Sequence, residues 1–195
     1  MSKPMNRKTF LTKAGLGTVA AASFPAALGA SDALGASLPP NNHRIGEFVA
    51  FSQAPAPALG LTQPRIGMNG AVTFDPHARW VKGGGGYELF DNFLPVPKPL
   101  VLTGQWKATD FLDYDTKGLG SYGLIQPGIL MLKADFENLG TGLSLTLVCN
   151  VGAAGLLTGD EEGWELEGTP YGDFHQLSPP VGITHLSVEG ISVTA

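Results

Sequence analysis

Three titratable side chains in the last quarter of the sequence have types that suit acid–base chemistry. Asp173 and His175 are separated by one residue, so they project from the same face wherever the segment is extended. His185 follows ten residues later, beyond the stiff pair Pro179-Pro180. A histidine beside a carboxylate can act as a general acid–base pair or supply two metal ligands. These three are the candidate catalytic residues, although a structural histidine pair fits the same spacing.

Four aromatic residues near glycine-rich segments suggest a ligand pocket: Trp80, Tyr87, Trp106 and Tyr171. Rings at the end of a β-structure can line the mouth of a binding site, where a few polar groups orient the ligand. We expect these four side chains to line an apolar pocket, with His175 as its polar group. The same rings can instead fill a packed core, and this alternative remains open.

Other motifs that commonly carry chemistry are incomplete. The run Gly83–Gly86 is not followed by a helix or a Lys-Ser/Thr pair, so it predicts a hairpin loop and not a phosphate cradle. Asp113-Tyr114-Asp115 begins like a calcium loop, but Lys117 and Leu124 stand where oxygen ligands are required. No histidine has metal-ligand spacing, and no Gly-x-Ser-x-Gly nucleophile motif is present. We therefore expect no metal site and no cofactor.

Short apolar runs separated by Gly, Pro, Asn and Asp place these candidates on strands, and no long window has a helical period. This pattern predicts an all-β fold, a single antiparallel sandwich or barrel of about 8–10 strands within residues 37–195. The candidate strands are 44–52, 71–74, 87–90, 100–109, 122–126, 129–138, 143–151, 164–167, 183–188 and 191–194.

The clearest alternation lies in residues 129–138, where Leu130, Leu132, Ala134 and Phe136 occupy every second position. A turn containing Gly140 and Gly142 separates this run from the apolar positions Leu143, Leu145 and Leu147. The two runs predict a central hairpin whose core side chains are Leu130, Leu132, Phe136, Leu145 and Leu147.

The N-terminal 36 residues have the layout of a signal peptide and linker. Four basic residues precede an uncharged, Ala-rich and Gly-rich stretch that ends in small residues. The stretch is short and interrupted by Pro25, which disfavours a permanent membrane anchor. Arg7, Phe10 and Leu11 match the bacterial twin-arginine signal, which residues 6–13 resemble. Lys8 replaces the second arginine, so the general secretory route remains the alternative.

The resemblance implies a periplasmic or secreted location. All four charged residues of the leader are basic, so its removal would leave 8 basic and 17 acidic residues, a net charge of −9. Such an acidic domain disfavours nucleic-acid binding, and we expect no membrane span in it. Its lone cysteine, Cys149, cannot form an internal disulfide.

Two functions remain in view. One is an exported domain that binds an apolar small molecule or an envelope protein. The other is a small barrel enzyme of the cyclase or isomerase type, which needs only one or two acid–base residues.

The leader makes a testable prediction. We expect cleavage after Ala30 or Ala36, so that the exported chain begins at Ser31 or Ser37. N-terminal sequencing of the protein from the cell envelope measures this directly, and an intact Met1 or Ser2 there would contradict it.

Overall fold

The computed structural model describes residues 43–92, 100–116, 125–150 and 161–188, and every regular element in them is a strand. The fold class expected from the sequence is therefore confirmed. The strands are β1 (Arg44–Gln53), β2 (Pro64–Asp75), β3 (Trp80–Asp91), β4 (Leu100–Asp115), β5 (Gly128–Phe136), β6 (Gly140–Cys149), β7 (Gly163–Thr169), β8 (Gly172–Gln176) and β9 (Gly182–Val188).

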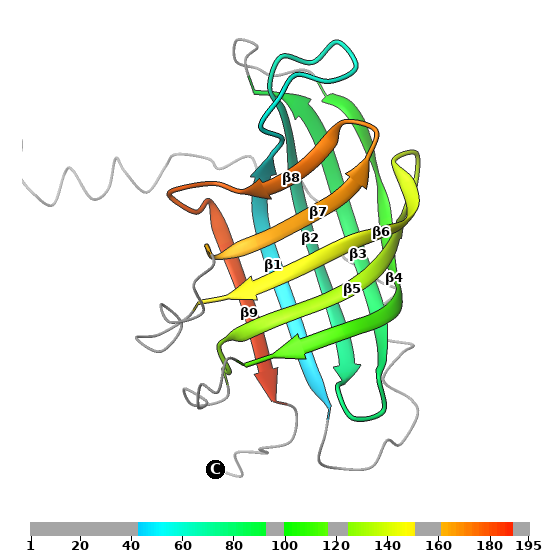
Figure 1. Ribbon diagram of the computed structural model, residues 1–195, viewed down its shortest axis with the longest axis vertical. Helices are drawn as coiled ribbons and strands as arrows, with labels where there is room; N and C mark the ends of the chain where they lie inside the picture. The colour runs from blue at the N-terminus through cyan, green and yellow to red at the C-terminus, as the bar shows by residue number, and fades with distance from the viewer. Residues whose placement is uncertain (1–42, 93–99, 117–124, 151–160, 189–195) are drawn as a thin grey trace, which may run out of the picture.

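The first eight strands form a closed antiparallel barrel (Figure 1). Each strand pairs with the next along the chain, and β8 returns to β1 through the pairs Ser52–Gln176 and Gln53–His175. Of the two architectures expected from the sequence, a sandwich or a barrel, the structure is a barrel. We call the end where β1 begins and β2 meets β3 the lower end, which is at the bottom of Figure 1. The described residues contain no helix long and apolar enough to cross a membrane.

The ninth strand completes the wall where β8 cannot reach. β8 occupies only the last two residues of β1, and β9 pairs with the rest of that edge, from Arg44 to Ala50 (Figure 1). On its other edge, β9 is held by the Glu162 carboxylate, which accepts the Thr184 amide at 2.6 Å and the Asn150 amide at the end of β6. One carboxylate thereby joins the end of β6 to β9.

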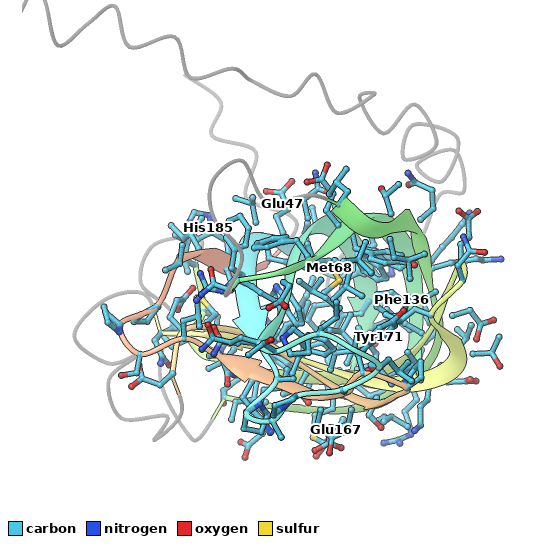
Figure 2. All side chains as sticks on the ribbon, turned by 90° about the horizontal axis from the view of Figure 1, so that it is seen from above. Glu47, Met68, Phe136, Glu167, Tyr171 and His185 are labelled. Carbon is cyan, nitrogen blue, oxygen red and sulfur yellow. The ribbon has the colours of Figure 1, made fainter. Side chains whose placement is uncertain are left out.

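Strict alternation sorts the side chains between the inside and the outside of the barrel. Viewed from above, Met68 and Phe136 lie within the ring of strands, whereas Glu47, Glu167 and His185 project outward (Figure 2). β5 and β6 form the predicted hairpin, in which Leu130 pairs with Leu147 and Leu132 with Leu145. All five predicted core side chains of this hairpin are buried. An eight-stranded barrel is just wide enough for such side chains to fill it or for its interior to hold one small ligand.

The glycine run lies in a strand, so the prediction of a hairpin loop there was wrong. Gly83–Gly86 belong to β3 and pair with β2, and three of them also pair with β4. A Cβ at Gly84 would lie 2.2 Å from the Trp106 carbonyl oxygen, and one at Gly85 would lie 2.0 Å from the Asn69 carbonyl oxygen. Glycine is used here because neighbouring backbones approach too closely for any side chain.

Strand lengths also differ from those expected. The predicted strand 71–74 is the end of the twelve-residue β2, because glycines hid its alternation. The expected strand 122–126 is described only at its end, where Ile125 forms an isolated bridge with Ser187. The expected strand 191–194 lies outside the described residues.

Glu162 gives the barrel a predictable pH dependence. Burial raises the pKa of its carboxyl, against the opposing effects of the two amide donors and of His185. Because the pKa of Glu162 is higher in the folded state than in the unfolded state, its contribution to folding stability is fully present below the unfolded-state pKa. This contribution is lost as the pH rises through the folded-state pKa.

We therefore expect the stability of the wild-type protein, relative to Glu162→Gln, to fall as the pH rises from about 4, the ordinary range of a glutamate carboxyl, through the raised pKa of Glu162. Urea unfolding of both proteins across this range measures the difference. A relative stability that increases with pH would contradict the assignment.

Candidate functional site

The structure groups three of the four predicted pocket aromatics inside the barrel. Trp106 stacks on Phe136 with ring centroids 6.0 Å apart, and Tyr87 meets the edge of Phe136 at 5.5 Å. The Tyr87 hydroxyl donates to the Glu137 carbonyl, and burial, Glu137 and nearby Tyr171 raise the pKa of Tyr87 to about 12. Tyr87 and Trp106 are buried, whereas Tyr171 is half-buried. These rings form the upper part of the core.

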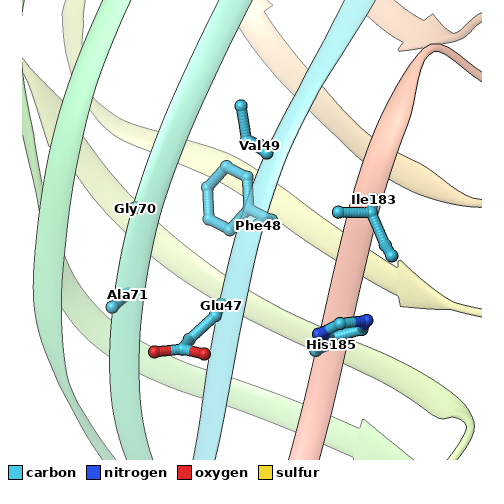
Figure 3. Close-up of a pocket in the computed structure, with 7 residues that line it drawn as sticks. All are labelled: Glu47, Phe48, Val49, Gly70, Ala71, Ile183 and His185. Atoms are coloured by element: carbon cyan, nitrogen blue, oxygen red, sulfur yellow. The ribbon is translucent and has the colours of Figure 1, made fainter. Parts of the chain in front are cut away.

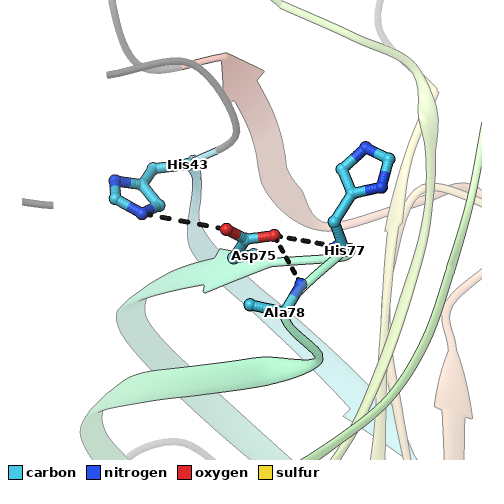
Figure 4. A network of polar contacts seen from close by, with 4 residues as sticks. All are labelled: His43, Asp75, His77 and Ala78. Carbon is cyan, nitrogen blue, oxygen red and sulfur yellow. Dashed lines mark hydrogen bonds and ion pairs between the residues drawn. The ribbon is translucent and has the colours of Figure 1, made fainter. Parts of the chain in front are cut away.

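Trp80 lies at the lower end, away from this group. Its ring meets His43 edge-on at 5.5 Å, and the His43 Nε2 lies 3.9 Å from the buried Asp75 carboxylate. The other Asp75 oxygen accepts the backbone amides of His77 and Ala78 at 2.8 and 2.9 Å (Figure 4). This carboxylate is used to shape the turn between β2 and β3, a common role for aspartate.

The three candidate catalytic residues lie on the outer surface and do not converge. Asp173 and His175 share a face of β8, as expected, but it is the outer face, because Phe174 between them is buried. Asp173 accepts the Gly168 amide, and His175 pairs with Glu165 at 3.3 Å. The grouping of His175 with the interior aromatics is therefore incorrect.

His185 is remote from these two residues. In the register of the sheet, His185 lies opposite Glu47 of β1, whereas His175 lies opposite Gln53 of the same strand. Six residues of strand separate those positions, which is about 20 Å. The described residues contain no group of three or more His, Cys, Asp or Glu side chains that could hold a metal ion.

A different residue, Arg44, has the features of a binding group. The inward positions of β1 are Gly46, Phe48, Ala50 and Ser52, and Arg44 falls on the same phase. In the sheet it pairs with Phe74 of β2, a fully buried residue. The first inward side chain of β1 is thus a guanidinium at the lower end of the barrel.

Two residues hold the Arg44 side chain in place. Its Nη1 donates to Gln126 Oε1 at 2.5 Å, and its Cζ lies 5.1 Å from the ring centroid of Tyr114, a cation–π contact. The Tyr114 hydroxyl also donates to Gln126 Oε1, at 3.2 Å. Two donors, one of them charged, therefore converge on a single amide oxygen.

The surroundings of these donors are apolar. Tyr114 packs edge-on against Phe74 at 5.1 Å, and Phe74 stacks on Phe111 at 6.3 Å. Burial raises the pKa of Tyr114 to about 12, although the Arg44 charge acts in the opposite direction and Cys149 adds to the increase. Tyr114 thus keeps its proton at neutral pH and remains a hydrogen-bond donor.

The Arg44 guanidinium is incompletely satisfied within the part of the chain that the structure describes. No carboxylate there forms an ion pair with it, and its Nε is covered by other atoms without having a hydrogen-bond partner. Inward charges in proteins are normally paired, and a buried donor left unpaired costs about 1–3 kcal/mol. Among the residues that the structure describes, the Arg44 guanidinium at the lower end therefore has no anionic partner.

This arrangement can bind a carboxylate. A ligand oxygen that replaced Gln126 Oε1 would accept hydrogen bonds from both Arg44 and Tyr114 and would neutralise the guanidinium. Gln126 can yield that position, because its place in the sheet is fixed by its backbone amide, which donates to Leu186 O at 2.8 Å. The apolar rings of Phe74 and Phe111 would then lie next to the remainder of the ligand.

Sequence reasoning missed this site, although a signal was present. The alternation from Gly46 to Ser52 places Glu47 outside and Phe48 inside, and extending it back two residues turns Arg44 inward. Its partners could not be found in this way. Gln126 and Tyr114 come from a segment before β5 and from β4, whose register has bulges near Asp110 and Asp113.

In comparisons with protein-family models, curated proteins and solved structures, nothing matches this chain. What the barrel does must be inferred from its own side chains.

Arg44 makes a prediction about stability. Arg44→Met removes an inward charge and its unpaired Nε but keeps an apolar chain of similar reach, so we expect the free energy of unfolding to rise by about 1 kcal/mol. Arg65→Met is the matched control, because Arg65 is also held by a glutamine, Gln53, but lies on an outward position of β2. We expect it to change stability by less than about 0.5 kcal/mol.

Urea unfolding of the three proteins provides the measurement. A structural role for Arg44 would instead make Arg44→Met clearly less stable than both the wild type and the control.

Proposed function

We propose that this chain is an exported binding protein whose barrel holds an apolar small molecule by its carboxylate at the lower end. The observation that carries the proposal is the inward guanidinium of Arg44, which has no carboxylate partner among the described residues. Binding sites are often mostly apolar with a few polar groups that fix orientation, and Phe74, Phe111 and Tyr114 provide such walls. The signal-like N-terminus supports export, which remains part of the proposal.

The chemistry of the site favours binding over catalysis. A general acid or base works best when its pKa lies near the operating pH. Tyr114 has a pKa of about 12, and an arginine stays charged at any physiological pH. Asp173, His175 and His185, the residues on which a barrel enzyme would have depended, lie on the outer surface. The donors at the lower end can hold an anion without exchanging protons with it.

The ligand class can be tested with matched probes. We expect 2-naphthoate and octanoate to bind more tightly than 2-naphthylmethanol and octanol, since only the carboxylates can form an ion pair with the Arg44 guanidinium. A hydrogen bond to a charged group contributes about 1.5–3 kcal/mol, so Arg44→Met should weaken carboxylate binding by about 10-fold to 100-fold. Binding of the alcohols should be unchanged. Calorimetric titration of the purified protein measures both series.

Two controls separate this site from non-specific charge effects. Arg65→Met removes an outward arginine and should leave all four affinities unchanged. Tyr114→Phe should weaken the carboxylates only, because it removes one donor and keeps the ring. The proposal fails if the carboxylates bind no better than the alcohols, or if Arg65→Met weakens them as much as Arg44→Met does.

A further inference from the structure

The outer face of β1 and β9 carries an apolar surface that is independent of the lower end. Of the large hydrophobic side chains exposed among the described residues, four are neighbours there: Val49, Phe51, Val181 and Ile183 are 54%, 36%, 47% and 45% exposed. Val49 pairs with Ile183 across the two strands, and the Phe51 amide donates to the Val181 carbonyl at 2.9 Å. Scattered apolar residues are normal on a protein surface, but a contiguous group indicates an interaction site.

A hollow of about 220 Å³ lies beside this group. Val49 and Ile183 form its upper part, and Glu47 and His185 its lower part (Figure 3). On the β2 side it is lined by Gly70 and Ala71, which have almost no side chain to fill it. We call the surface formed by Glu47, Val49, Phe51, Val181, Ile183 and His185 the β1–β9 face.

The register of the two strands makes the β1–β9 face complementary to itself. Its partners across the strands are Glu47 with His185, Val49 with Ile183, and Phe51 with Val181. A two-fold axis can run between β1 and β9, parallel to both strands. Such an axis places each residue of one copy opposite the residue of the second copy that is its cross-strand partner. Glu47 then faces His185 of that copy, and apolar side chains face each other above them. An isologous interface requires this property.

The local charge of the β1–β9 face is compatible with a second copy. The chain as a whole is acidic, and like net charges repel, so two copies can meet only on a surface that lacks this excess of acidic residues. The β1–β9 face does not share this excess, because it carries one acid and one histidine beside apolar side chains. A partner that presents the same residues in reverse order matches both the charge pattern and the apolar group.

We propose that the β1–β9 face binds a second copy of this chain, forming a two-fold symmetric dimer in which Glu47 of each copy meets His185 of the other. The proposal goes beyond the ligand-binding function and does not depend on it, since Arg44 points to the inside of the barrel.

Charge exchange between chains tests the geometry. We expect sedimentation velocity of the purified protein, from about 1 µM to about 500 µM, to show a concentration-dependent dimer. Glu47→Lys alone and His185→Glu alone should each weaken the dimer at least about 10-fold, because the first removes the carboxylate that meets His185 and the second makes two carboxylates face each other. An equimolar mixture of the two variants should restore it. In the mixed dimer the introduced lysine meets the introduced glutamate, and the native His185 of one chain meets the native Glu47 of the other.

A second pair of variants covers the possibility that His185→Glu disturbs Glu162. Val49→Lys and Ile183→Glu should separately prevent dimerisation and should form a mixed dimer together. Met131→Asp is the control, because Met131 is 40% exposed on β5 and lies outside the β1–β9 face. It should dimerise like the wild type.

Three results would overturn the proposal. They are a monomeric wild type over the whole range, dimerisation that the single variants leave unchanged, and mixtures that fail to recover. Carboxylate binding by the same variants should equal that of the wild type, so a failure of the dimer and a failure of the ligand site are distinguishable.

Discussion

The need to satisfy one edge of β1 determines the architecture of this protein. A barrel must pair every strand edge, but β8 reaches only Ser52 and Gln53, which leaves the edge from Arg44 to Ala50 to β9. β9 in turn needs partners on its own far edge, and Glu162 and the backbone of Gln126 provide them. The barrel is therefore closed by the pairing of β8 with the end of β1, and β9 completes the wall along the remainder of β1.

This closure creates the two surfaces to which we assign functions. Because Gln126 is held against β9 through its backbone, its side chain is placed where it meets Arg44 and Tyr114. The outer side of the same β1–β9 pair presents the apolar face proposed for a second copy. The ligand site and the dimer surface thus lie on opposite sides of one pair of strands, and substitutions on one need not disturb the other.

How much the sequence could predict depended on whether the information was local. The period-two alternation around Leu130 and the turn at Gly140 predicted the central hairpin correctly, because a strand with one buried face requires that pattern. The glycines at 83–86 were misinterpreted, since they are needed where β2 and β4 approach β3 closely, and the glycine run itself does not reveal this packing. The phase of Asp173 and His175 was correct, but alternation alone does not say which face is inside. The alternation in β1 was sufficient to place Arg44 on the inner face. Its contact with Tyr114 could not be predicted, because β-bulges shift the register of β4.

The central claim is that an anion binds at the Arg44 guanidinium, and NMR can observe that group itself. In a ¹H–¹⁵N spectrum of arginine side chains, assigned with Arg44→Met, the account predicts that 2-naphthoate shifts the Arg44 Nε–H resonance at saturation. The Arg65 and Arg79 resonances should stay in place, because those side chains already donate to Gln53 and to the Leu112 carbonyl. An unchanged Arg44 signal in the presence of bound naphthoate, or equal shifts at all three arginines, would contradict it.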